Sequence, residues 1–388
     1  MTAPLDGVLV ADFSRVLAGP MAAMTLADLG ATVVKVERPG VGDESRAWGP
    51  PWTARSSAYY ECANRSKYSV ALDLADPQDR ARAITLASRA DVVVENYRPG
   101  SLARFGLDYA SVSALNPRAV YCSMTGFGDD AGRDRPGYDF LVQAVGGLMS
   151  ITGDVDGEPT KVGVAVVDVL TGKDAVIGIL AALAARATTG RGQHVQVELL
   201  SSLLGGLVNQ AAGFLATGVP PGRMGNRHPS VVPYQTLRCS DGPLAVACGN
   251  DGQFERLVGV LGRPELANDP RFTSNSDRVA HRDELIPALE LRTATLPAAK
   301  WEALLSSAGV PAGLVGDVGN AIARADGFGL APTLDLGDGE VRQIRHPVRY
   351  SDSAVGTAVR PPGVGEHDAL VHAWLDGDDD AVLPRRSV

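Results

Sequence analysis

The sequence has little of what marks metal-binding, disulfide-rich and nucleic-acid-binding proteins. Its four cysteines, at positions 62, 122, 239 and 248, form neither a C-x-x-C pair nor a metal-ligand spacing, so we expect free thiols, a reducing compartment and no metal site. The 36 basic residues are outnumbered by 45 acidic ones, and this net charge of −9 argues against nucleic acid as a partner. An anionic ligand is still possible, because a few well-placed arginines can reverse the field locally.

Targeting and membrane-spanning patterns are missing as well. The N-terminal residues lack a basic segment followed by an apolar core, so no signal peptide is expected. No uncharged apolar run approaches the roughly 20 residues of a membrane span. We therefore expect a cytoplasmic protein without a membrane partner. Its 388 residues suffice for two domains of about 100–200 residues each.

The first third of the chain alternates between β-branched strands and helices. The pattern predicts strands at 7–13, 31–37, 69–74, 91–95 and 119–124, with helices at 21–29 and 78–90. Strands separated by helices of this length indicate βαβ units and a parallel sheet.

The pattern changes after residue 171. Two Ala- and Leu-rich helices are predicted at 172–189 and 199–216, followed by a linker at 219–230 that is rich in Pro, Gly and Arg. A smaller α/β unit follows, with a strand at 244–248 and helices at 253–261, 283–294 and 297–308.

The turn after the first strand, residues 14–20, lacks the G-x-G-x-x-G spacing. Without those glycines the backbone is not expected to approach a pyrophosphate, so we expect neither NAD nor FAD as a ligand. Arg38 follows the second strand, where it suits the ribose phosphate of an ADP group. A solvated surface charge is an equally good interpretation of Arg38 from its spacing alone.

The fourth strand ends in another candidate ligand loop, because ligands of open α/β sheets bind at the carboxyl ends of strands. Asn96 offers an amide for hydrogen bonding, Tyr97 offers a ring face to an adenine, and Arg104 adds a positive charge. The alternative, which the residues alone slightly favour, is an ordinary loop with a Pro-initiated turn.

Two aspartates, Asp168 and Asp139, each allow a structural and a functional interpretation. Asp168 lies in an apolar stretch, where a lone carboxylate is expensive to bury unless it is hydrogen-bonded or functional. From spacing alone a helix N-cap is the commoner role for Asp168. Asp139 is by default a turn residue after Pro136 and Gly137.

A series of motifs, spread in order along the chain, favours the functional interpretations of these residues over the structural ones. They are Pro4-Leu-Asp-Gly7, Ala18-Gly-Pro20, Leu26-Ala-Asp-Leu-Gly30, Val36-Glu-Arg-Pro39, Gly42-Asp43 with Arg46, Asn64-Arg-Ser-Lys67, Glu95-Asn96 with Arg98-Pro-Gly100, Gly126-Phe-Gly128, Asp168, Ile179-Leu-Ala-Ala182 and Gly190-Arg-Gly-Gln193. With them the chain resembles, over nearly its whole length, the class III CoA-transferases, a superfamily that includes formyl-CoA transferase, carnitine CoA-transferase and the α-methylacyl-CoA racemases.

The resemblance implies a reaction and a set of site residues. Asp168 would be the nucleophile that accepts an acyl group and then CoA, as an aspartate of ordinary pKa, about 3.9, is ionised at neutral pH; Asp139 would assist it near the thioester. The positions expected to contact CoA are Val16, Leu17, Ala18, Arg38, Leu72, Asn96, Tyr97 and Arg104. Acyl-CoA and a carboxylic acid would be the substrates, without a tightly bound cofactor.

The chain also departs at several positions from the family that it resembles. Ala75 and Pro136 stand where lysines often contact CoA, and Arg135 is a candidate replacement for the second. Leu17 replaces a glutamine of formyl-CoA transferase, and the 225–229 loop is not its glycine-rich flap, which argues against formate and oxalate as substrates. Tyr138 replaces the histidine of the racemases. An α-methylacyl-CoA racemase or isomerase is the second hypothesis, and a non-catalytic acyl-CoA-binding protein is the third.

The resemblance further implies an α/β fold in two domains. A large Rossmann-like parallel-sheet domain would comprise residues 1–225 and 326–388, and a small α/β domain would comprise 226–325. Two chains would form an interlocked homodimer.

Overall fold

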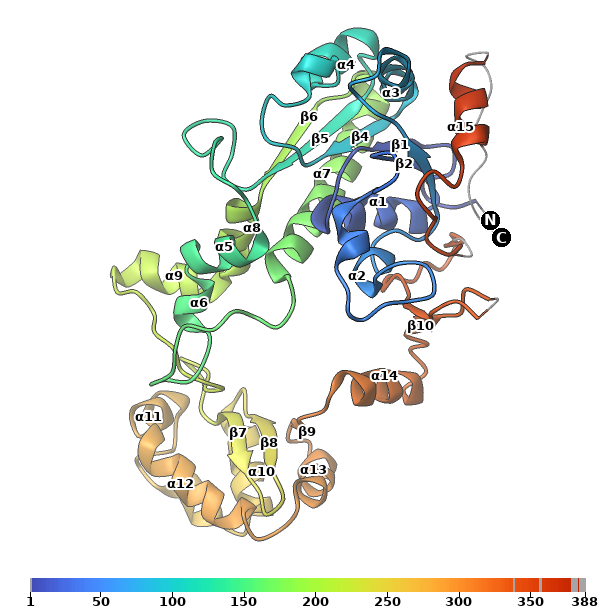
Figure 1. Cartoon of the computed structure of the whole chain (residues 1–388). Coiled ribbons are helices and arrows are strands. Elements are labelled where there is room, and N and C mark those ends of the chain that lie inside the picture. Colours follow the sequence, from blue (N-terminus) through green and yellow to red (C-terminus); the bar gives the residue numbers. More distant parts are fainter. Residues whose placement is uncertain (1, 338, 356–357, 378–382, 384–388) are drawn as a thin grey trace. The chain divides into compact units, whose positions relative to one another are not determined.

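The computed structural model describes residues 2–337, 339–355, 358–377 and 383. The chain divides into two compact units, of which the first comprises 1–148, 161–219 and 332–388 and the second comprises 149–160 and 220–331 (Figure 1). The short segment 149–160 thus belongs to the second unit. Whether each unit is an independently folding domain with the predicted limits stays a prediction.

The first unit is built around a six-stranded sheet in which every neighbouring pair is parallel. Its strands are β1 (Leu9–Asp12), β2 (Thr32–Glu37), β3 (Lys67–Ala71), β4 (Val92–Glu95), β5 (Val120–Thr125) and β6 (His194–Glu198), in the order β3-β2-β1-β4-β5-β6. The predicted parallel α/β sheet is confirmed. The sixth strand was not predicted, because polar residues alternate with its two valines.

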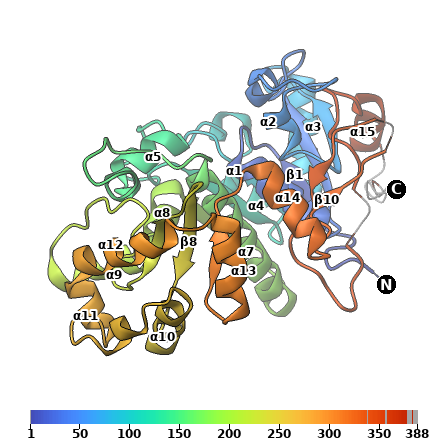
Figure 2. The ribbon, with the colours of Figure 1, turned by 90° about the horizontal axis from the view of Figure 1, so that it is seen from below.

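Helices cover both faces of this sheet. Apolar side chains of α1 (Ala18–Asp28) and α7 (Val166–Thr189) bury one face, and those of α3 (Pro77–Arg89), α4 (Tyr109–Leu115) and α15 (Asp368–Leu375) bury the other. Helix α15 lies against α3 and β3, so the end of the chain completes the first unit (Figure 2). Strands covered on both faces explain the continuous apolar runs in the sequence.

Two predicted helices have different limits in the structure. Helix α7 begins at Val166 rather than at Gly172, which places Asp168 inside its first turn. The predicted helix at 199–216 is divided into α8 (Leu199–Gly206) and α9 (Val208–Thr217), which meet at an angle of 81°. Among the described residues no single helix is long and apolar enough to cross a membrane, although this bent pair passes by length and composition.

Shorter elements complete the first unit. They are η1 (Glu44–Ala47), α2 (Ala58–Glu61), η2 (Ala103–Phe105), α5 (Asp139–Val145), β10 (Thr333–Leu334) and β11 (Gln343–Ile344), with α6 (Leu148–Ile151) at the boundary. Helix α5 contacts both α7 and α8, which brings Asp139 to the start of α7.

The second unit has its own apolar core. An antiparallel sheet of β7 (Tyr234–Arg238), β8 (Pro243–Ala247) and β9 (Ala312–Leu314) packs with α10 (Asp251–Val260), η3 (Pro264–Asn268), α11 (Asn275–Ala280), α12 (Arg282–Thr293) and α13 (Ala298–Ser307), and α14 (Val318–Gly327) follows. The predicted strand at 244–248 and three predicted helices are confirmed to within a few residues at their ends.

Candidate active site

The order of the parallel strands reverses between β1 and β4, and the loops that follow these two strands flank that point. Ligands of open α/β sheets bind outside the carboxyl ends of the strands at such a reversal. Two cavities of about 440 and 270 Å³ lie here within the first unit, and Arg15 and Tyr97 line both of them.

All ten residues that the sequence analysis proposed for the site line these cavities. The larger cavity is lined by Val16, Leu17, Ala18, Asn96, Tyr97, Asp139 and Asp168, and the smaller one by Arg38, Leu72, Tyr97 and Arg104. Their roles in catalysis and CoA binding stay predictions at this point.

Asp168 is the third residue of α7 and is not its cap. The residue before the helix is Ala165, which makes no side-chain capping bond, so the N-cap interpretation of Asp168 is wrong. Burial, reinforced by the negative charge of Asp139, raises the pKa of Asp168 to about 7. The expectation of an ordinary carboxyl pKa is therefore also wrong, and a substantial fraction of Asp168 is protonated at neutral pH.

Asp139 supplies the capping bonds that α7 lacks. Its Oδ1 accepts hydrogen bonds from the backbone N–H groups of Val167 (2.8 Å) and Asp168 (3.3 Å), and its Oδ2 accepts one from the Nε2 of the buried Gln143 (2.6 Å). The default interpretation of Asp139 as a turn residue is wrong, because Asp139 is the first residue of helix α5. Asp139 fixes the backbone of Asp168, and its charge sets part of the pKa of that residue.

Tyr59, whose hydroxyl feels the charge of Asp168, and its neighbour Trp48 were not predicted as site residues. Burial and the charges of Asp168 and Asp139 raise the pKa of Tyr59, on α2, to about 12, so its hydroxyl stays protonated as a hydrogen-bond donor. Trp48 packs edge-on against the Tyr59 ring, with 5.2 Å between ring centroids. Neither residue follows a strand end or belongs to a catalytic spacing, so the sequence offered no signal for them.

The side chain of Asn96 binds the backbone of the loop after β1. Its Oδ1 accepts a hydrogen bond from the Arg15 N–H (2.8 Å), and its Nδ2 donates to the Arg15 carbonyl (2.7 Å). The Arg15 guanidinium in turn lies 4.7 Å from the centroid of the Tyr97 ring and pairs with Glu44 at 3.0 Å. Asn96 therefore shapes the neighbouring loop, and its expected hydrogen bond to a ligand stays a prediction.

Exposed arginines supply positive charge at both cavities. Arg38 and Arg104 line the smaller one, and Arg133 and Arg135 line the larger one. Within the part of the chain that the structure describes, none of the four is paired with a carboxylate. Ala75 and Pro136, where the family resemblance leads us to expect lysines, also line the cavities, and Arg135 adds charge beside Pro136.

Comparison with known proteins decides the family. A family model described as CoA-transferase family III matches residues 5–368. The chain belongs to this family. The succinate–glutarate CoA-transferase of Agrobacterium fabrum is 42% identical over 98% of each chain, and the acetyl-CoA:oxalate CoA-transferase of Acetobacter aceti is 42% identical over 82% of each. A crystal structure of a CaiB/BaiF family protein from Brucella suis is 45% identical, covers 97% of this chain and 100% of that one, and gives a TM-score of 0.87.

The protein is thus a class III CoA-transferase, and its substrates are an acyl-CoA and a carboxylic acid. The enzyme class predicted from the sequence is confirmed. This result favours CoA transfer over the two other hypotheses, the racemase and the non-catalytic binding protein.

Proposed function

We propose that the enzyme transfers CoA between dicarboxylic acids and that Asp168 carries the CoA as a covalent thioester. The observation that carries the proposal is the position of Asp168, a partly buried carboxylate at the wall of the larger cavity, where its backbone is fixed by Asp139. A carboxylate held in this way has little freedom to lose when it attacks.

In the first half of the reaction an oxygen of ionised Asp168 attacks the thioester carbonyl carbon. The C–S bond breaks, CoA leaves as a thiolate, and a mixed anhydride remains. The thiolate then attacks the Asp168 carbonyl carbon, which releases the donor acid and leaves an aspartyl-CoA thioester. The acceptor carboxylate attacks that thioester, and the displaced thiolate takes the new acyl group and frees Asp168.

Both the chemistry of the cavity and the relatives support a dicarboxylic acid. One carboxylate of the acceptor must reach the thioester, and a second needs a positive partner. Arg133 and Arg135 line the same cavity as Asp168, and guanidinium groups suit bidentate pairing with carboxylates. The Agrobacterium fabrum relative is named for succinate and glutarate, which are both dicarboxylic acids. The Acetobacter aceti relative is named for the dicarboxylic acid oxalate as acceptor, with acetyl-CoA as the donor.

The covalent intermediate provides the direct test. Mixing the enzyme with succinyl-CoA and no acceptor should give a protein whose intact mass is increased by one CoA less one water. Hydroxylamine should discharge the adduct and leave a hydroxamate in the peptide that contains Asp168. The exposed Asp174 lies on the same helix, and Asp174→Asn should form the same adduct. A CoA adduct or hydroxamate on any other residue would contradict the proposal. So would the absence of an adduct with every acyl-CoA donor that the enzyme uses as a substrate.

The acceptor class is tested by supplying succinyl-CoA with glutarate, oxalate, butyrate or formate. We expect transfer to at least one dicarboxylate and much slower transfer to the monocarboxylates. Butyrate or formate as the best acceptor would contradict the dicarboxylate assignment and leave the role of Asp168 intact.

We also propose that Arg38 holds a phosphate group of CoA. Arg38→Ala should raise the dissociation constant of CoA at least about tenfold, since a hydrogen bond to a charged group is worth about 1.5–3 kcal/mol and 1.4 kcal/mol is a factor of ten. Arg191→Ala removes an exposed arginine that precedes β6, at the opposite edge of the sheet, and should leave the constant unchanged. Calorimetric titration with CoA measures both, and equal constants for Arg38→Ala and wild type would refute the assignment.

We keep the interlocked homodimer as a proposal. Helices α7 and α9 expose the large apolar side chains Ile177 and Leu215, of which 65% and 82% are accessible in the single chain. Apolar surface of this kind is typical of subunit interfaces.

A further inference from the structure

The loop between β1 and α1 is held by side chains to an unusual degree. The Ser14 N–H donates to Asp12 Oδ1 (3.0 Å), and the Ser14 carbonyl accepts from Lys35 Nζ (2.8 Å). The N–H and carbonyl of Arg15 both bond the Asn96 side chain, as described above. Four consecutive backbone groups are therefore satisfied by side chains of β1, β2 and the loop after β4.

The next residue, Val16, adopts a strained backbone conformation. Its φ of 71° lies in the left-handed region, which is unfavourable for a β-branched side chain. Its N–H points at the Asp43 carboxylate, with 3.2 Å from the nitrogen to each oxygen. Strain of this kind persists only where the surroundings fix the conformation.

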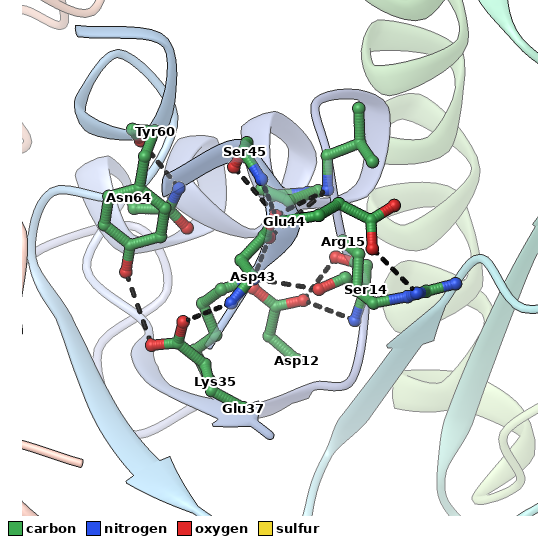
Figure 3. Close-up of polar contacts among 12 residues, drawn as sticks. Asp12, Ser14, Arg15, Lys35, Glu37, Asp43, Glu44, Ser45, Tyr60 and Asn64 are labelled. Atoms are coloured by element: carbon green, nitrogen blue, oxygen red, sulfur yellow. Dashed lines mark hydrogen bonds and ion pairs between the residues drawn. The ribbon is translucent and has the colours of Figure 1, made fainter. Parts of the chain in front are cut away.

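An ion pair and several hydrogen bonds hold the Asp43 carboxylate in place beside the Val16 N–H (Figure 3). Its side chain is fully buried and pairs with the equally buried Lys35 at 3.0 Å, and its Oδ1 also accepts hydrogen bonds from the N–H and Oγ of Ser45. Burial alone would raise the pKa of Asp43, but Lys35 and the Ser45 donors lower it to about 2. Asp43 therefore stays charged across the working pH range, and its pair with Lys35 holds Ser14 and Val16 from both sides.

The loop that this pair holds forms a wall of the substrate site. Arg15 lines both cavities, and Val16, Leu17 and Ala18 line the larger one together with Asp168. Asp43 itself lines only the smaller cavity, where its oxygens are already occupied by the bonds described above.

We propose that Asp43, paired with Lys35, is a positioning residue that holds Val16 in the strained conformation required for CoA binding. The identity of the ligand rests on the function proposed above. Loss of the Asp43 charge should let Val16 relax to an ordinary backbone conformation and move the cavity wall. Binding of CoA should suffer, whereas the chemistry at Asp168 should change little once the donor saturates the enzyme.

The first measurement compares two buried ion pairs. Asp43→Asn should raise the dissociation constant of CoA about tenfold, the equivalent of 1.4 kcal/mol, with kcat within about threefold of wild type. Asp28→Asn breaks the buried pair of Asp28 with Arg65, whose other hydrogen bonds among the described residues go to Gln343 and Ile344 rather than to the loop. This variant should lose comparable thermal stability without a change in CoA affinity. Equal weakening of CoA binding in both variants would overturn the proposal.

The second measurement removes the strain. Glycine adopts a positive φ at no steric cost, so in a Val16→Gly background the loop no longer needs Asp43 to the same extent. Asp43→Asn should then weaken CoA binding only about twofold relative to Val16→Gly alone, a difference that a double-mutant cycle reports. A purely structural role of Asp43 predicts the same loss in both backgrounds, and that result would also overturn the proposal.

Two further outcomes distinguish a failure of this proposal from a variant that does not fold and from a failure of the proposed function. If Asp43→Asn does not fold, Ser45→Ala removes one donor to Asp43 while retaining the ion pair, and it should still weaken CoA binding two- to threefold, which is less than one lost charge-assisted bond. Unchanged CoA affinity in Ser45→Ala would then count against the proposal. A wild-type enzyme that binds CoA but forms no aspartyl-CoA adduct would refute the proposed function and leave the Asp43 measurement valid.

Discussion

Asp168→Asn should lower turnover by as much as about 10⁶-fold, the scale of losing a covalent nucleophile, and should at the same time make the protein more stable at pH 8. An amide has no charge with which to attack the thioester, so both the adduct and the exchange should disappear. Turnover within tenfold of wild type would mean that Asp168 is not the nucleophile.

The expected gain in stability follows from the pKa of Asp168, about 7 in the folded chain against an ordinary value of 3.8. Between these values the folded protein binds more protons than the unfolded chain, so the contribution of Asp168 to stability falls as the pH rises from about 4 to 7. The neutral asparagine avoids this cost. We expect a gain of about 1–3 kcal/mol at pH 8 that vanishes near pH 4.

Urea unfolding of both proteins at pH 5 and pH 8 measures this difference. Loss of a helix cap would instead lower stability by about 1 kcal/mol at either pH. The exposed Asp174→Asn on the same helix is the matched control and should show no pH-dependent gain. A variant that is less stable than wild type at pH 8 would contradict the raised pKa.

Much of the fold was accessible from the sequence because its signals are local. Apolar β-branched runs predicted five of the six parallel strands, and the missed one, β6, has polar residues in alternate positions. The start of α7 was placed six residues too late, since the glycine at 172 resembles a break, whereas α1 packs directly against it and leaves no room for a side chain there.

The site was accessible in part. Positions after strand ends led to Arg38 and Asn96, and the family motifs led to Asp168. The roles of Asp43 and Tyr59 were not accessible, because they depend on which loops meet in space. The same holds for the pKa of Asp168: a sequence does not say that a carboxylate will be buried beside Asp139.

The raised pKa of Asp168 also governs the expected pH dependence of the reaction. Only ionised Asp168 can attack, so kcat/KM for the acyl-CoA, which reports the free enzyme, should be constant above about pH 7.5 and fall tenfold for each pH unit below 7. At pH 5 the loss should reach about 100-fold. Initial rates between pH 5 and 9 at a donor concentration well below KM give this profile.

Glu95 is the main competing explanation for such a profile, because burial raises its pKa to about 7 as well, and its carboxylate accepts the backbone N–H of Tyr97. Two variants separate the groups. Asp139→Asn removes the charge beside Asp168 and should move the midpoint of the profile to lower pH, although burial, the larger cause, should keep it above the ordinary value of 3.8. Glu95→Gln should leave the midpoint near 7 if Asp168 sets it. A midpoint that disappears in Glu95→Gln and stays fixed in Asp139→Asn would assign the titration to Glu95 and would remove the pH dependence from the nucleophile.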